Sequence, residues 1–187
     1  MEDQLDTITM PAPVEYVVQN SVVKSFDFAT MKDDVKAILA GDEARKWLGE
    51  PLSDDTLDIL AKGAYGFRAF GVIDQSGGAE KCVGFIYFSP APFEELATVI
   101  HGVSPDAGRA VTATFVKGSD APRGVMSRAM EDACNAVVNG RADMCVTAFV
   151  AEDNVASRRF LEKNGFVDVG VSTVEDHEKD RVYVRKN

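Results

Sequence analysis

The sequence predicts a single α/β domain built from about seven strands and about four helices. Three observations support this prediction. The 187 residues fit one domain of ordinary size, and no linker divides them. Stretches rich in β-branched and aromatic residues alternate with stretches whose apolar residues recur at helical spacing. Between residues 143 and 166, a strand, a sharp corner, a short helix, a glycine stop and a new strand follow one another.

The first third of the chain is predicted to form an arm, one strand and two helical segments. Residues 1–13 contain prolines and no periodic pattern, which indicates an N-terminal arm before a domain that spans residues 14–187. Val14 to Lys24 is β-rich and fits the first strand. Apolar residues recur at helical spacing between Ser25 and Gly66, with a polar loop after Pro51 that separates the two segments.

The middle of the chain is predicted to contain a hairpin and a fourth strand. Phe67 to Asp74 and Lys81 to Phe88 fit two strands, because the turn residues Gln75 to Ala79 join them. Leu96 to Val103 fits either a strand or a short helix. Arg109 to Val116 alternates in polarity and is predicted to be the fourth strand.

The last third is predicted to hold a long helix and three strands. A loop from Lys117 to Gly124 leads into a helix from Val125 to Val138. The apolar residues on one side of that helix are Met126, Met130, Ala133, Cys134 and Val137. After the 143–166 unit, Val167 to Thr173 and Arg181 to Arg185 fit two strands around the charged turn 175–180.

The bulk composition excludes several classes of protein. The net charge of −10 disfavours nonspecific nucleic-acid binding and favours a cationic partner, such as an amine or a basic peptide. No apolar run reaches the ~20 residues of a membrane span, and the acidic start lacks the layout of a signal peptide. A cytoplasmic protein without a membrane partner is therefore expected.

The cysteines and histidines do not form a metal-binding pattern. Cys82, Cys134 and Cys145 are odd in number and form no CxxC pair, and His101 and His177 are far apart in the sequence. Buried free thiols are expected, and no metal.

The 143–166 unit carries the clearest motif. Met144 to Val150 reads as a buried strand, after which either Asp153 or Asn154 can cap a helix. Gly165 can end that helix in the left-handed conformation, and Phe166 begins the next strand. An ordinary strand–helix–strand corner would share these features. The order strand, Asn-x-x-Ser and Leu-Glu-Lys-x-Gly-Phe is more specific.

This unit resembles the GNAT superfamily of acyl-CoA-dependent N-acyltransferases, through Asn154, Ser157, Leu161 to Lys163 and Gly165-Phe166. The resemblance implies a mixed, mostly antiparallel sheet that splits between its fourth and fifth strands. It also implies acetyl-CoA as co-substrate, with its pantetheine arm in the split and in contact with Asn154. Around Asn154 the sequence looks most like the ribosomal-protein N-terminal acetyltransferase subgroup.

The resemblance also assigns a phosphate loop between the fourth strand and the third helix. GNAT proteins carry Gln/Arg-x-x-Gly-x-Gly/Ala there, and backbone N–H groups at the helix start hold the pyrophosphate. Gly124 matches the first glycine, whereas Ala121 and Met126 depart from the pattern. Arg123 can offer its charge to a phosphate. At the end of the fourth strand, the resemblance also implies a backbone N–H that polarises the acyl carbonyl. The expected cofactor-binding residues are therefore Phe115, Val116, Lys117, Arg123, Gly124, Val125, Met126, Ser127 and Asn154.

The chemistry that the resemblance implies needs a proton acceptor for the amine and a proton donor for the departing thiolate. Many family members use a Tyr as the acid, but Leu161 stands at that position. Ser157 is the candidate acid, or holds a water that acts as one; alternatively its hydroxyl bonds the carbonyl of Asp153. His101 is the candidate base, with a structural role or a water relay as alternatives.

The sequence therefore predicts an N-acetyltransferase that moves an acetyl group from acetyl-CoA to a primary amine by direct attack. The acceptor is a small-molecule amine, a protein N-terminus or a Lys of a basic protein, and a homodimer is left open. The alternative is a catalytically weak or inactive GNAT-fold module that binds CoA or a protein. Leu161 and Met126 favour the alternative, and Ser157 and Asn154 favour the enzyme.

Overall fold

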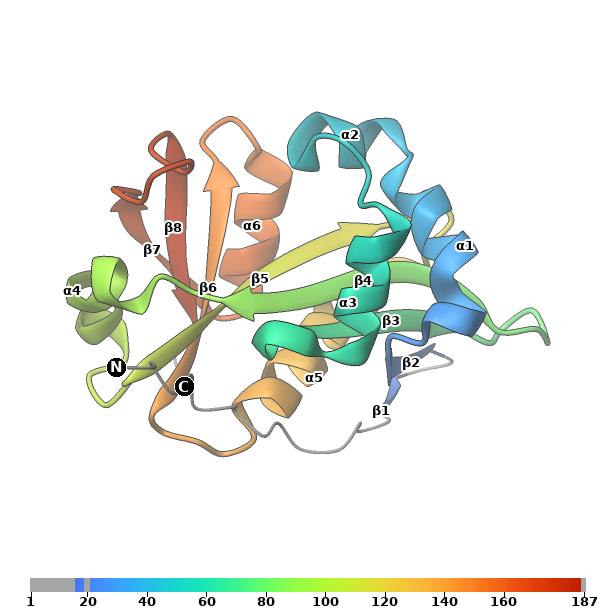
Figure 1. The fold of residues 1–187 in the computed structure, drawn as a ribbon, viewed down its shortest axis with the longest axis horizontal. Helices are drawn as coiled ribbons and strands as arrows, with labels where there is room; N and C mark the ends of the chain where they lie inside the picture. The colour runs from blue at the N-terminus through green and yellow to red at the C-terminus, as the bar shows by residue number, and fades with distance from the viewer. Residues whose placement is uncertain (1–15, 19–20, 186–187) are drawn as a thin grey trace.

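An eight-stranded sheet runs through the computed structural model, which describes residues 16–18 and 21–185 (Figure 1). The strands lie in the order β1-β2-β3-β4-β5-β6-β8-β7. Their bounds are Tyr16–Val18 (β1), Ser21–Ser25 (β2), Arg68–Asp74 (β3), Lys81–Pro90 (β4), Arg109–Lys117 (β5), Met144–Ala151 (β6), Phe166–Val171 (β7) and Asp180–Arg185 (β8). The predicted arm, residues 1–13, lies outside the described residues.

Helices cover both faces of this sheet. The described residues form α1 (Phe28–Leu39), α2 (Asp42–Leu48), α3 (Asp54–Lys62), α4 (Phe93–Val103), α5 (Val125–Val138) and α6 (Val155–Lys163), and a short 3-10 helix, η1 (Ala64–Gly66). Helices α5 and α6 pack on one face, while α1 to α4 lie on the other (Figure 1). Within the described residues, none of these helices has the length and apolar character to cross a membrane.

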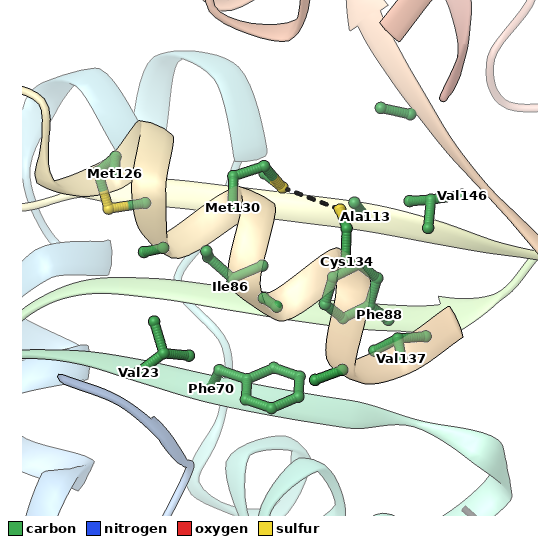
Figure 2. Close-up of a cluster of buried hydrophobic side chains, with 14 of the residues drawn as sticks. Val23, Phe70, Ile86, Phe88, Ala113, Met126, Met130, Cys134, Val137 and Val146 are labelled. Atoms are coloured by element: carbon green, nitrogen blue, oxygen red, sulfur yellow. Dashed lines mark hydrogen bonds between the residues drawn. The ribbon is translucent and has the colours of Figure 1, made fainter. Parts of the chain in front are cut away.

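The predicted apolar side of α5 is buried against the sheet (Figure 2). Met130 and Cys134 are fully buried, and they pack in one cluster with Phe70 of β3 and with Ile86 and Phe88 of β4. Burying one such side chain contributes about 1.5–3 kcal/mol. This cluster fixes α5 across the middle of the sheet, so the start of α5 is held close to the end of β5.

The sheet is mixed and mostly antiparallel, as predicted. β5 and β6 form a parallel pair, whereas each of the other described strand pairs is antiparallel. The pairing of β5 with β6 ends at Thr112 and Thr147. Beyond this point β5 stays with β4 as far as Lys117, and β6 stays with β8 as far as Ala151. We call this divergence of residues 113–117 from residues 148–151 the split (Figure 1).

The number of helices is six instead of about four, for two local reasons. Gly41 and Gly49 bound α2 and divide the first predicted helical segment into α1 and α2. The segment that fitted either a strand or a helix lies in α4. Leu96 and Ile100 stand one turn apart there, and both are buried against the sheet.

The predicted first strand, 14–24, accounts for the additional strand. Its described part forms two short antiparallel strands, β1 and β2, in which Tyr16 is opposite Val23. The remaining strands and the long helix agree with the prediction to within two residues at each end, which is the usual uncertainty of such bounds.

Candidate functional site

Two threonines mark the point at which β5 and β6 separate. Thr112 and Thr147 are the last opposed residues, and their Oγ1 atoms lie 3.1 Å apart. The hydroxyl of Thr147, which is fully buried, donates to the carbonyl of Val111 at 3.3 Å. The Thr112 hydroxyl is then the donor to Thr147. This short chain of hydrogen bonds fixes the closed end of the split.

The edge of β5 that faces the split carries backbone groups of alternate residues. Gly118 donates its N–H to Val83, and Ala110 accepts from Ala91, so even-numbered residues bond towards β4. Arg109 donates to Asp143, next to β6, which agrees with this alternation. The N–H groups of residues 115 and 117 therefore point into the split, and that of residue 116 points towards β4. Of the three residues predicted to bind the cofactor at this edge, Phe115 and Lys117 thus direct their N–H groups into the split, and Val116 does not.

The start of α5 is open. Gly124 has φ +84°, and a Cβ built on it would meet no atom within 4 Å. No side chain caps the helix. The N–H of Val125 is used by the Pro122 carbonyl at 3.3 Å, whereas the N–H groups of Met126 and Ser127 have no partner among the described residues. Free first-turn N–H groups of this kind attract anions.

Met126 does not obstruct this helix start, although a small residue was expected there. Its side chain is buried in the cluster beneath α5 (Figure 2). Gly84 of β4 provides the space, because a Cβ on Gly84 would overlap the Met126 sulfur. Only the backbone of Met126 faces the helix start. The larger side chain at this position of the motif is therefore accommodated by packing in the core.

The start of α6 is closed by a side chain. Asn154 is buried, with 7% of its surface exposed, and its Oδ1 accepts from the N–H of Ser157 at 3.1 Å. Asn154, rather than Asp153, is thus the cap. The Ser157 hydroxyl takes part in no hydrogen bond of the described residues, so the bond to the Asp153 carbonyl does not form; that carbonyl accepts from Val155.

An aromatic pair, missed by the sequence analysis, spans from β5 to α6. The rings of Phe115 and Phe160 lie with centroids 4.7 Å apart, and both side chains are half-buried. Leu161, at the position where the family often has a Tyr, is fully buried in the core. The half-buried residues of α6 are Ser157, Arg158 and Phe160, and of these Arg158 is bonded to Tyr183 and Glu152. Because Phe115 and Phe160 are far apart in the sequence, no local sequence pattern indicates their contact.

His101 lies away from this group. It is an exposed residue near the end of α4, and its Nε2 is 3.0 Å from the carbonyl oxygen of Ala107. Helix α4 packs with Ala110 and Cys145, which belong to rungs before the split. The structure thus joins Asn154 to Ser157 within α6 and the β5 end to α6 through Phe115 and Phe160, and it leaves His101 at the paired end of β5 and β6.

The three cysteines are free, buried thiols, as predicted. Burial raises the pKa of Cys82 and of Cys145 to about 11, and that of Cys134 to about 12. These thiols are protonated at neutral pH and are poor nucleophiles. In the described part of the chain, no three His, Cys, Asp or Glu side chains gather as a metal site would require.

Comparisons with known proteins agree with this geometry. A protein-family model described as "Acetyltransferase (GNAT) domain" matches residues 28–167. No curated protein sequence matches the chain. Among solved structures, the chain is similar to the ribosomal-protein-S5-alanine acetyltransferase of Vibrio fischeri, with a TM-score of 0.64 and 17% identity over 93% of this chain and 97% of that one.

Two further solved structures share the fold. NAA60 of Arabidopsis thaliana, in complex with a bisubstrate analogue, has a TM-score of 0.65 and 14% identity, covering 88% of this chain and 98% of that one. A GNAT-family acetyltransferase of Bacillus anthracis has a TM-score of 0.64 and 16% identity, covering 91% and 96%. At these identities the likeness extends to the fold of the whole domain.

Proposed function

We propose, on the premise that the chain belongs to the GNAT family of acetyltransferases, that it transfers an acetyl group from acetyl-CoA to a primary amine. The observation that carries the proposal is the split of β5 from β6, together with a helix start whose N–H groups have no partner among the described residues. In this proposal the split takes the acyl arm, and the helix start takes the phosphates.

The start of α5 is the proposed pyrophosphate site. The N–H groups of Met126 and Ser127 would bind phosphate oxygens, and Gly124 leaves room for their approach. Arg123 is exposed next to the loop and adds a positive charge. Val125 contributes packing, since its side chain is buried and its N–H is already bonded.

The split is the proposed site of the acyl arm. The N–H groups of Phe115 and Lys117 lie on its β5 edge, where they can donate to the amides of the arm and to the acyl carbonyl. Donors that face a developing oxyanion lower the barrier to attack. On the β6 side the Asn154 oxygen is committed to its cap, so the amide NH₂ is the group it offers to a ligand.

Direct attack by the amine is the proposed route. The acetyl thioester supplies an activated carbonyl, and the buried thiols, whose pKa values are raised by burial, do not compete as acyl acceptors. The Ser157 hydroxyl, half-buried and without a hydrogen bond among the described residues, is the proposed proton donor to the thiolate, directly or through a water.

The proposed acceptor is cationic in its free form: a small-molecule amine, a protein N-terminus or a Lys of a basic protein. The net charge of −10 supports this class, because a negative surface raises the local concentration of cations. Three free thiols suit a reducing compartment, so we propose a cytoplasmic location. A monomer and a homodimer are equally compatible with this scheme.

A CoA-binding module without catalysis is the second candidate. The observation in its favour is Leu161, which is fully buried and provides no hydroxyl at the position of the usual Tyr. The two candidates share cofactor binding and differ in turnover.

Thermal melting with acetyl-CoA, CoA and longer acyl-CoAs tests the shared part first. A ligand that binds only the folded state stabilises it by ~2.7 kcal/mol at 100 times its dissociation constant. A panel of spermidine, Lys-containing peptides and peptides with free N-termini then tests turnover with acetyl-CoA. Binding with acetylation of any panel member supports the enzyme. Binding without turnover supports the module, and the absence of binding contradicts both.

A further inference from the structure

The second histidine of the chain, His177, is held in a defined orientation by two neighbours. Its Nδ1 lies 2.8 Å from Oδ2 of Asp180, and its ring stacks on Phe149 with centroids 4.2 Å apart and planes 13° apart. The sequence analysis assigned no role to His177.

Phe149 places this histidine beside the split. Phe149 follows Thr147 by two residues on β6, so both side chains lie on the same face, about 7 Å apart along the strand. That face is the one covered by α1 to α4, since Phe149 packs against the cluster beneath α4. Phe149 pairs with Val182 of β8, one strand away from the split. The ring of His177 therefore lies against β6, the strand that borders the split, on the face opposite α5 and α6.

The contact with Asp180 determines which ring nitrogen can accept a proton. A carboxylate only accepts hydrogen bonds, so Nδ1 must carry the proton that it donates to Asp180. Nε2 then keeps its lone pair in the neutral ring. A base held in one tautomer by an acidic partner is the arrangement that proton abstraction requires.

We propose that His177 is the general base for the acceptor amine, and that Asp180 is its positioning residue. This inference rests on the proposed acetyl transfer. Nε2 takes one proton from the ammonium group, and the freed electron pair of the neutral amine forms the C–N bond. The C–S bond breaks with its electrons on sulfur, and the thiolate takes a proton from Ser157 or a water, which regains it from the second N–H proton of the new amide nitrogen. The imidazolium afterwards releases its proton to solvent.

The charges around His177 fit a cationic acceptor. The hollow next to the ring is lined by Glu175, Asp176, His177, Glu178, Lys179 and Asp180. Acidic side chains exceed basic ones in this set, and β6, which packs against the ring, presents the uncharged Phe149. An ammonium group would thus be attracted to the nitrogen that deprotonates it.

The two histidines offer a matched comparison. His101 differs from His177 in that its Nε2 is bonded to the Ala107 carbonyl and its helix packs at the paired end of β5 and β6. When a general base has been removed by mutation, added imidazole can take over its role. The role of a packing residue cannot be restored in this way.

The test uses purified full-length protein, acetyl-CoA and the panel amine that the wild type acetylates fastest. His177→Ala is expected to lower kcat/KM by a factor of about 10² to 10⁴. Added imidazole is expected to raise the kcat/KM of His177→Ala at least tenfold. The acetyl-CoA dissociation constant should stay within a few-fold. His177→Phe keeps the stack on Phe149 and is expected to be as inactive as His177→Ala, whereas His101→Ala should change kcat/KM by only a few-fold.

Asp180→Asn addresses the positioning role. It is expected to lower kcat less than His177→Ala and to leave the KM for the amine nearly unchanged, because the ring loses the acceptor that fixes its tautomer, whereas Asp180→Glu keeps a carboxylate acceptor and is expected to retain more activity than Asp180→Asn. Full activity of His177→Phe, or a loss in folded His177→Ala that imidazole does not reverse, would overturn the inference while the transferase survives. A wild type that acetylates no amine would instead remove the proposed function itself.

Discussion

Helices α5 and α6 both begin beside the split, and they begin in opposite ways. At α5 the first residue before the helix is Gly124, exposed and in the left-handed conformation, with no side-chain cap. At α6 it is Asn154, buried and bonded to the N–H of Ser157. The two helix starts lie at the ends of neighbouring strands. Among the described residues, α5 has a partner for only the first of its first three N–H groups, whereas α6 has partners for two of them.

This difference assigns the two starts different tasks. Open N–H groups at α5 form a ready site for an anion, whereas α6 has its first turn stabilised within the protein. What α6 can offer to the reaction is therefore a side chain, and Ser157 is the half-buried hydroxyl without a hydrogen bond among the described residues. The α5 start is proposed to bind, and the α6 start to position and to donate a proton.

The largest effect is expected at the α6 start. Ser157→Ala should lower turnover by a factor of about 10² to 10⁴, because the departing thiolate loses a positioned proton donor. Acetyl-CoA affinity, measured by calorimetry, should stay within a few-fold. Ser157→Thr keeps a hydroxyl and is the control. If Ser157→Ala turns over at the wild-type rate, the proton comes from water or from the substrate.

Asp168 of β7, which pairs with Arg181 of β8 and with Arg158 of α6, provides the next test. Burial raises the pKa of Asp168, but hydrogen bonds from Arg181 and from the Gly170 N–H more than offset this and leave the pKa below its usual value. Arg158 of α6 lies 3.8 Å from the same carboxylate. Asp168→Asn should therefore lower the free energy of unfolding by about 1.5–3 kcal/mol at pH 7.

The pH dependence gives the sign of this effect. A depressed pKa in the folded state stabilises the protein above the unfolded value of ~3.9, and this contribution is lost as the pH falls through the folded value. Urea unfolding should thus show the difference between wild type and Asp168→Asn at pH 7, and this difference should shrink as the pH is lowered below ~3.9. Asp106→Asn, an exposed carboxylate, serves as the control. Equal stability at pH 7 would mean that the ion pairs of Asp168 do not stabilise the fold.

A charge at the α5 start should weaken cofactor binding. Gly124→Asp is expected to raise the CoA dissociation constant at least tenfold, because a carboxylate would repel the pyrophosphate. Gly124→Asn has nearly the same shape and the same tolerance of positive φ, so the pair isolates the charge. Calorimetry on both variants checks this. Identical affinities for Asp and Asn would place the phosphates elsewhere.

The smallest effect is expected for the α6 cap. Asn154→Ala should destabilise the protein by about 1 kcal/mol through the loss of its bond to Ser157. Asn154→Asp keeps the accepting oxygen and replaces only the NH₂ group. Comparing the CoA-induced shift in melting temperature separates the two roles. A shift that is unchanged in both variants would make Asn154 a cap alone.

The sequence determined the features that depend on neighbouring residues. The hairpin of β3 and β4 follows from its turn residues, and the buried side of α5 follows from apolar residues at helical spacing. Asn154 as a cap was likewise predicted, as one of two options, because a cap acts over three residues. Local propensity and periodicity suffice for such elements, since each one is decided within a turn or a strand.

The tertiary structure decided what depends on distant partners. Met126 is accepted at a position predicted for a small residue because Gly84, on another strand, makes room for it. Leu96 and Ile100 became helical because a sheet face was available to cover them. His177 was one unassigned residue in a charged turn until the fold stacked it on Phe149. Contacts between residues far apart in the chain leave no periodic trace in the sequence, and only packing in three dimensions brings them together.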